Sequence, residues 1–169
     1  MQLRAMEIAD LPFLYQWEND AAAWADGGTH NPLSRKLLRE YIESSTGDIY
    51  KDGQLRLIID EAGETLGCID LFDLDARSRK AAIGMYVSPQ ARGRGVGKEA
   101  VRLLEEYAAR FLHLHTLYAI ISVGNQPCRA IYEQAGFSAS AQLKDWIIQP
   151  DETYCDAIVY QKVYEAGIV

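Results

Sequence analysis

The stretch Arg92-Gly93-Arg94-Gly95-Val96-Gly97-Lys98 decides the fold of this chain. It follows an apolar run from Ile83 to Val87 that is typical of a strand, and it opens an amphipathic pattern that is typical of a helix. Glycines let a backbone approach a ligand closely, and the free N–H groups at a helix N-terminus bind anions without side chains. The stretch therefore predicts a phosphate-binding loop between a strand and a helix.

Two common nucleotide-binding motifs do not match this loop. A P-loop requires Gly, four residues and then Gly-Lys-Ser/Thr, but Arg92 stands at the first glycine position and Glu99 follows Lys98. A dinucleotide-binding G-x-G-x-x-G motif is excluded because Lys98 stands at its last glycine position. The pattern that matches is Arg-x-x-Gly-x-Gly, formed by Arg92, Gly95 and Gly97.

A second motif runs from Asn125 to Phe137 and reads NQPCRAIYEQAGF. Asn125 suits a helix N-cap and Gly136 a C-terminal cap, but capping does not require Tyr132, which lies two helical turns after Asn125 on the same face. Together the two motifs resemble those of the GNAT family of N-acetyltransferases. The wider pattern, including Trp17-Glu18-Asn19-Asp20, is similar to the RimJ/RimL and spermidine acetyltransferase branch.

The resemblance implies one domain over residues 1–169 with the α/β (α+β) GNAT fold. We expect a central mixed, mostly antiparallel twisted sheet of about six or seven strands, with a splay between the fourth and fifth strands, flanked by about four helices. Strand patterns cover Gln2–Met6, Leu55–Asp60, Thr65–Phe72, Lys80–Val87, Thr116–Ser122, Ser138–Ile147 and Tyr154–Val163. Helices are predicted to begin at Asp10, which is expected to cap the first, at Ser34, after the glycine loop and at Asn125.

The resemblance also implies an acetyl-CoA-dependent N-acetyltransferase in which a primary amine attacks the thioester directly in a ternary complex, without a metal. Its cofactor-binding residues would be Met85, Tyr86, Val87, Arg92, Gly93, Arg94, Gly95, Val96, Gly97, Lys98 and Asn125. The loop would hold the pyrophosphate, the strand backbone would pair with the pantetheine arm, and the Val87 N–H would stabilise the oxyanion. Tyr132 would be the catalytic acid for the thiolate, unless it is simply a core aromatic residue.

The general base stays open at this stage. Many members of the family carry an acidic residue where this chain has Ala82. The remaining candidates are Asp70, Asp73, Glu18 or a chain of water molecules. Because of Ala82, a non-catalytic acyl-CoA-binding module with the same fold is the alternative function.

The acceptor is expected to be a polyamine such as spermidine, or a protein N-terminal amine. A polyamine needs several carboxylates around the acceptor site, and the candidates are Glu18, Asp20, Asp26, Glu40 and Glu43. Trp24 is a candidate for the edge of the same site. The sequence does not place these residues precisely enough to choose between the two acceptors.

Composition sets the remaining expectations. The chain has 17 basic and 24 acidic residues, a net charge of −7, which disfavours nucleic-acid binding and suits a cationic partner. Without a signal peptide or a long apolar run, and with three cysteines lacking metal-ligand spacing, we expect a cytoplasmic protein that does not bind membranes.

Two further features are interpreted without a catalytic role. His113 and His115 are interpreted as structural residues. The apolar Tyr154–Val163 strand is interpreted as able to pair across a homodimer or higher oligomer.

Overall fold

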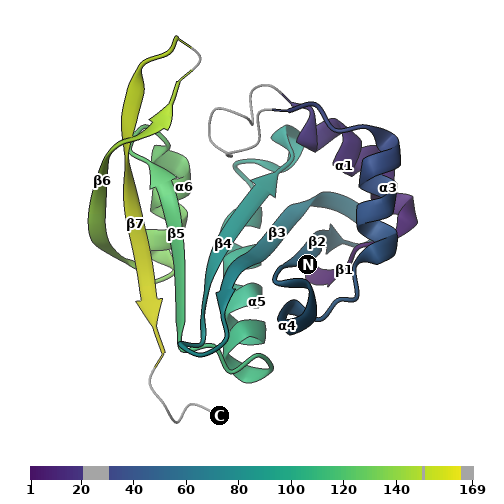
Figure 1. Cartoon of the computed structure of the whole chain (residues 1–169), viewed down its shortest axis with the longest axis horizontal. Helices are drawn as coiled ribbons and strands as arrows, with labels where there is room; N and C mark the ends of the chain where they lie inside the picture. The colour runs from purple at the N-terminus through teal and green to yellow at the C-terminus, as the bar shows by residue number, and fades with distance from the viewer. Residues whose placement is uncertain (21–30, 150, 165–169) are drawn as a thin grey trace.

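A computed structural model describes residues 1–20, 31–149 and 151–164 of the chain, so Trp24 and Asp26 lie outside the described residues. The strands form one seven-stranded sheet in the order β1-β2-β3-β4-β5-β7-β6 (Figure 1). Their bounds are β1 (Gln2–Ala5), β2 (Leu55–Glu61), β3 (Glu64–Asp75), β4 (Lys80–Val87), β5 (Thr116–Ser122), β6 (Ser138–Ile148) and β7 (Tyr154–Val163). All strand pairs are antiparallel except β4 with β5, which confirms the mixed, mostly antiparallel sheet implied by the family resemblance.

The described residues contain five α-helices, one more than expected. They are α1 (Leu11–Glu18), α3 (Arg35–Ser44), α4 (Ile49–Asp52), α5 (Val96–Arg110) and α6 (Gln126–Gln134), with short 3-10 helices η1 (Ile8–Asp10) and η2 (Pro89–Ala91). The additional helix is the one-turn α4, which Gly53 ends at a positive φ of 73°. Within the described part of the chain, no helix is long and apolar enough to cross a membrane.

The splay between β4 and β5 is the feature that positions the site. The two strands pair over three residues only, from Lys80 with Thr116 to Ala82 with Tyr118. Beyond Ala82 the ribbons diverge, while the other edge of β4 stays paired with β3 up to Val87 (Figure 1). The edge of β4 that faces β5 is therefore left without a strand partner from Ile83 onward.

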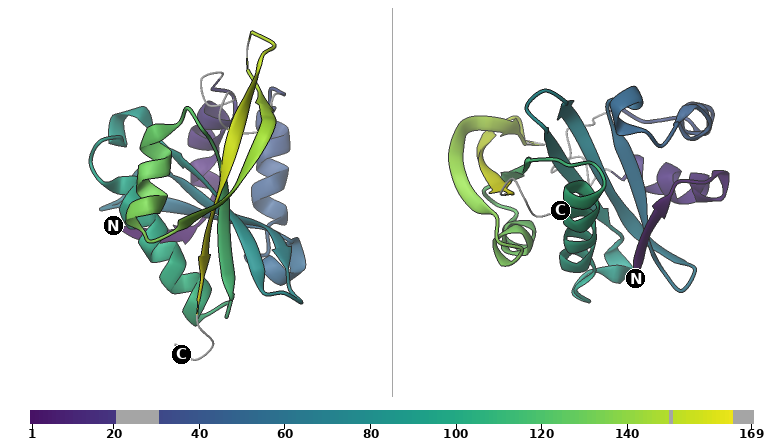
Figure 2. Two further views of the ribbon diagram at one scale, coloured as in Figure 1. Left: turned by 90° about the vertical axis from the view of Figure 1, so that its left-hand side faces the viewer. Right: turned by 90° about the horizontal axis from the view of Figure 1, so that it is seen from below.

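Helices cover both faces of the sheet (Figure 2). Helix α5 packs on one face through its buried stripe of Ala100, Val101, Leu104 and Ala108, and α6 lies on the same side. Helices α1 and α3 pack on the opposite face, where Leu14 and Leu38 contact the Ile58 side of the sheet. The two faces of the splay thus have different surroundings.

Two expectations about individual residues need correction. Asp10 precedes α1 but makes no capping bond to it; its carboxylate accepts from Arg4 (2.8 Å) and from the Glu7 N–H (2.8 Å) instead. Strand β7 cannot pair across a dimer by its edge, because β5 and β6 occupy both of its edges. The edge strands of the sheet are β1 and β6, and β6 is the one next to β7.

Candidate active site

The glycine loop forms an anion site at the N-terminus of α5. Gly93 and Gly95 have φ values of 74° and 81°, in the left-handed region that favours glycine. Gly95 is the N-cap and supplies no side-chain cap, and its carbonyl accepts the first intrahelical bond, from the Glu99 N–H at 3.1 Å. The N–H groups of the first helical turn, from Val96 to Lys98, have no intrahelical partner and suit a diphosphate.

The side chains of the loop have different roles. Arg92 donates from Nε to the Val87 carbonyl at 3.1 Å and fixes the end of β4, whereas Arg94 pairs with Glu61 at 3.3 Å. The Lys98 side chain has no hydrogen bond or ion pair to any described residue. A Cβ on Gly97 would lie 2.8 Å from Cδ1 of Ile131, so this glycine also allows α5 to pack closely against α6.

The backbone at the end of β4 points two N–H groups into the splay. The N–H of Ser88 donates to the Leu66 carbonyl of β3 at 2.9 Å. Because N–H directions alternate along a strand, the N–H groups of Met85 and Val87 point toward the opposite edge, which faces β5. These are the groups that the sequence assigned to the pantetheine arm and the oxyanion.

Side chains of β4 separate onto the two faces of the sheet. Met85 and Val87 contact the core under α5 and α6. Tyr86 lies on the other face, where its ring centroid is 5.4 Å from that of Trp17. The Tyr86 hydroxyl donates a hydrogen bond to the Asp20 carboxylate at 3.4 Å. By the same alternation the backbone of Tyr86 faces β3, and its side chain lies on the α1 side, so a contact of Tyr86 with the cofactor stays a prediction.

Helix α6 positions the predicted acid. Asn125 is the N-cap of this helix, and its side-chain oxygen accepts from the Cys128 N–H at 3.1 Å. The capping role of Asn125 is confirmed, and its contact with the pantetheine arm stays a prediction.

The predicted acid, Tyr132, is only 2% exposed and packs edge-on against Phe137, with the ring centroids 5.2 Å apart. No residue within 1–20, 31–149 or 151–164 hydrogen-bonds to its hydroxyl. Burial raises the pKa of Tyr132 well above its usual value, so the phenol stays protonated at neutral pH, as an acid must.

The face of the sheet under α1 and α3 carries a buried ionic cluster that the sequence analysis did not identify as a unit. Arg56 on β2 binds Asp70 on β3 through two bonds of 2.8 and 2.7 Å and also pairs with Glu18 of α1. The three side chains are 18%, 21% and 18% exposed, and the guanidinium lies 5.7 Å from the Tyr41 ring. The available signal was an arginine inside the apolar run of residues 55–59.

Asp73 and Tyr118 form a second polar pair on this face. Tyr118 is in register with Ala82 at the base of the splay, and its hydroxyl donates to the Asp73 carboxylate at 3.1 Å. Asp73 has a φ of 55°, an uncommon conformation for a residue other than glycine. Ala82 itself is buried and carries no polar group.

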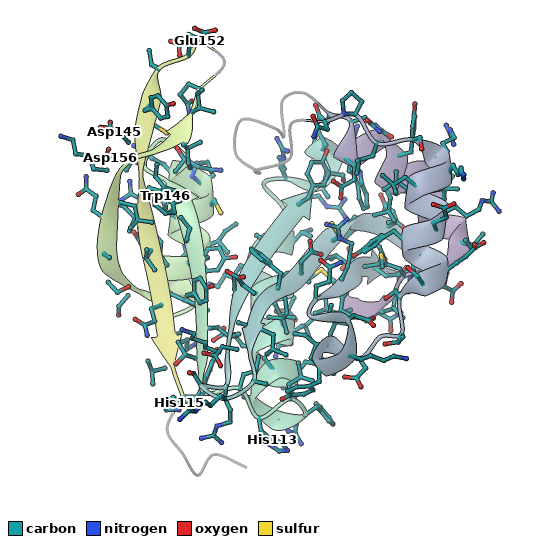
Figure 3. All side chains as sticks on the ribbon, in the orientation of Figure 1. His113, His115, Asp145, Trp146, Glu152 and Asp156 are labelled. Carbon is teal, nitrogen blue, oxygen red and sulfur yellow. The ribbon has the colours of Figure 1, made fainter. Side chains whose placement is uncertain are left out.

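Other candidates lie away from the splay. Glu40 and Glu43 are exposed on α3, where Glu40 pairs with Lys36 at 3.7 Å, and their place in the acceptor site stays a prediction. His113 and His115 lie at the far end of the sheet, where β5 begins (Figure 3). The described side chains contain no group of three or more His, Cys, Asp or Glu that could hold a metal ion.

Comparison with known proteins identifies the family. Residues 1–138 match the model of the acetyltransferase (GNAT) domain, which covers more than half of the chain. The chain belongs to the GNAT acetyltransferases. It is 26% identical over 146 residues to spermidine N(1)-acetyltransferase of Escherichia coli K12, which covers 85% of this chain and 75% of the relative. This GNAT acetyltransferase therefore uses acetyl-CoA.

Solved structures show the same fold. Spermidine N-acetyltransferase from Vibrio cholerae, in complex with CoA and spermine, superposes with a TM-score of 0.85 at 22% identity, covering 96% of this chain and 94% of the other. RimL, a ribosomal L7/L12 alpha-N-protein acetyltransferase in complex with coenzyme A, superposes with a TM-score of 0.82 at 18% identity, with coverages of 95% and 92%. At these identities the likeness establishes the fold.

Proposed function

We propose that this GNAT enzyme transfers the acetyl group of acetyl-CoA to a primary amine of a polyamine such as spermidine. The observation that carries the proposal is the collection of carboxylates on the α1 side of β3 and β4. Glu18 and Asp70 pair with Arg56 on this side, and Asp20 and Asp73 accept from the hydroxyls of Tyr86 and Tyr118 there. Such a surface attracts a substrate with several positive charges. The similarity to spermidine acetyltransferases supports the same substrate class.

The two substrates would approach from opposite faces. The first-turn N–H groups of α5 bind the diphosphate, and the Met85 and Val87 N–H groups pair with the pantetheine arm along the unpaired edge of β4. The thioester supplies an activated acetyl group, and the Val87 N–H donates to the oxygen on which negative charge develops during attack. Tyr132, protonated and buried beside the same strand, gives its proton to the departing sulfur.

A protein N-terminal amine is the second candidate. It is favoured by the structural likeness to RimL, which acts on a ribosomal protein. An N-terminal amine carries a single charge, so its electrostatic attraction to the carboxylates would be weaker than that of a polyamine. The ratio of activities with the two kinds of acceptor therefore separates the candidates.

The test is release of CoA, followed with a thiol reagent, in the presence of acetyl-CoA and a panel of acceptors. We expect kcat/KM for spermidine to exceed that for a monoamine of similar length and for short peptides by at least about tenfold, which corresponds to 1.4 kcal/mol of added transition-state binding. A higher kcat/KM for short peptides than for spermidine would instead support a protein N-terminal amine as the acceptor. Binding of acetyl-CoA by calorimetry without release for any amine would support the non-catalytic module.

We also infer that copies of the chain associate. A spermidine N-acetyltransferase of Vibrio cholerae with the same fold is described as dodecameric. Here the edge strand β6 exposes Trp146 and Ile148, and the tip of the β6–β7 hairpin projects beyond the rest of the molecule (Figure 1). Light scattering coupled to size-exclusion chromatography should give a mass above that of one 18.9 kDa chain, and a monomer at micromolar concentration would contradict the inference.

A further inference from the structure

One face of α6 carries three polar side chains in succession, those of Asn125, Cys128 and Tyr132. Asn125, at the N-cap, accepts from the Cys128 N–H at 3.1 Å. Residues three and four positions apart are neighbours on a helix surface, so the Cys128 side chain lies next to those of Asn125 and Tyr132. The proposed reaction uses Tyr132 but gives the Cys128 thiol no role.

The packing of α6 shows which way Cys128 faces. Ile131, three residues later, reaches across to α5, because a Cβ on Gly97 would lie 2.8 Å from its Cδ1 and 3.2 Å from the terminal methyl carbon of Met85 on β4. Cys128, Ile131 and Met85 pack against the same core cluster. Cys128 is only partly buried. Its thiol therefore lies on the side of α6 that faces the glycine-loop helix and β4, and part of its surface is accessible.

The Tyr132 hydroxyl marks a ligand position beside this thiol. The Tyr132 side chain is 2% exposed, and its hydroxyl has no hydrogen-bond partner within residues 1–20, 31–149 and 151–164. Within those ranges every fully enclosed side-chain oxygen has a partner, so this oxygen opens into accessible space. Long helical side chains lean over the preceding turn, which here carries Cys128, and burial and then Cys128 raise the pKa of Tyr132. A ligand atom bonded to this phenol would therefore lie close to the thiol.

The proposed reaction puts the sulfur of CoA at that position, because Tyr132 gives its proton to the departing thiolate. We propose that Cys128 is a modification site that forms a mixed disulfide with CoA held in the splay; the inference rests on the placement of the cofactor in the proposed function. The attached CoA would occupy the cofactor site and stop acetyl transfer. Reduction by a free thiol would release it and restore activity.

The step is a thiol–disulfide exchange, and its oxidant is a disulfide of CoA with a small thiol. In such a compound the small thiol takes the place of the acetyl group. The Cys128 thiolate attacks the CoA sulfur and forms the new S–S bond as the old S–S bond breaks. The electron pair of the old bond leaves with the small thiol, which takes up the proton that Cys128 lost. The Cys128 sulfur is oxidised and the small thiol is reduced.

The test compares the disulfide of CoA and cysteamine with cystamine, which has the same leaving group and no nucleotide. Peptide mass spectrometry follows the adducts on Cys128 and on a matched control, Cys155, a partly exposed thiol on β7 that lies 3.4 Å from the Ser122 hydroxyl. We expect the CoA disulfide to label Cys128 at least about tenfold faster than Cys155, because binding raises the local concentration of the reagent. Cystamine should show no such preference, and acetyl-CoA should protect Cys128.

Activity gives a second readout. The labelled wild-type enzyme should lose acetyl transfer and regain it with dithiothreitol, whereas Cys128→Ser should keep its own untreated rate after the same treatment. Labelling of Cys128 that acetyl-CoA does not slow, or that cystamine matches, would overturn the proposal and leave the proposed function intact. Protected labelling in an enzyme that releases no CoA with any amine would support the proposal and overturn the proposed function.

Discussion

Replacing Arg56 with methionine tests whether the buried ionic cluster holds α1 against the sheet. Methionine has a similar length and can pack against Tyr41, so little volume is lost. The substitution removes the partner of both Asp70 and Glu18 and leaves two carboxylates close together at low exposure. The charge effect therefore dominates the packing effect.

The expected magnitude follows from the exposure of the cluster. Breaking a buried pair by removing one partner costs about 3–5 kcal/mol, and we take about 3 kcal/mol because roughly a fifth of each side chain reaches solvent. For a chain of this size that corresponds to a decrease in Tm of about 6–12 °C. With an m-value of about 2 kcal/mol/M, the urea midpoint should fall by about 1.5 M.

Equilibrium urea unfolding at pH 7 is the assay, and Arg102→Met is the matched control. Arg102 on α5 also pairs with two carboxylates, those of Glu99 (2.7 Å) and Glu106 (3.4 Å), but it is 56% exposed. Its removal should cost no more than about 1 kcal/mol. Equal losses for the two arginine variants would refute the reasoning from burial. Adding Asp70→Asn to Arg56→Met should recover part of the stability, since one uncompensated charge is removed.

Three further predictions concern other buried groups. Burial alone would raise the pKa of Asp10, but hydrogen bonds from Arg4 and the Glu7 N–H hold it below its usual value, so this carboxylate stabilises the fold at neutral pH and stops doing so as pH falls through its folded pKa. Asp10→Asn should therefore lower the free energy of unfolding by about 1–3 kcal/mol at pH 7, and by less below about pH 4. Gly67→Ala should destabilise the fold by about 1–3 kcal/mol and reduce kcat, because a Cβ there would lie 2.2 Å from the Tyr86 carbonyl oxygen and must push β4 away. Burial raises the pKa of Cys68 to about 12, so this thiol should resist iodoacetamide at pH 8 until the protein unfolds.

The controls for these predictions are within the same chain. Urea unfolding at pH 3 and pH 7 checks Asp10→Asn, and a stability difference that grows in acid would contradict the sign. Gly124→Ala is the control for Gly67→Ala, because its nearest non-neighbouring atom is 3.8 Å away, and equal effects on kcat would count against the strand displacement. Mass spectrometry of labelled peptides checks the thiols: Cys128 and Cys155 are partly exposed and should react first.

The sheet could be predicted from the sequence because its signals are local. Lys80–Val87 and Thr116–Ser122 have the predicted bounds, since apolar alternation and turn residues define strands at close range. The helix start at Ser34 was also predicted correctly: Ser34 is the N-cap, and its hydroxyl accepts from the Leu37 N–H at 3.1 Å. The splay followed from the family likeness and not from the residues of either strand.

The acceptor side could not be assembled from the sequence, because its residues are far apart in the chain. Glu18, Arg56 and Asp70 meet only when β2 and β3 pair and α1 lies over them. Tyr118 and Asp73 meet because a register shift, which has no reliable sequence signal, changes the direction of one side chain. Tertiary pairing therefore determines which of the predicted carboxylates lie together on this face.

The central claim is that acetyl transfer uses the hydroxyl of Tyr132 as the acid for the leaving sulfur. The most direct measurement is kcat of Tyr132→Phe with spermidine, together with the Kd for CoA from titration calorimetry. We predict a kcat lower by about 100-fold with a Kd within about twofold of the wild type, because the phenyl ring keeps its packing against Phe137. A kcat equal to that of the wild-type enzyme would contradict the account.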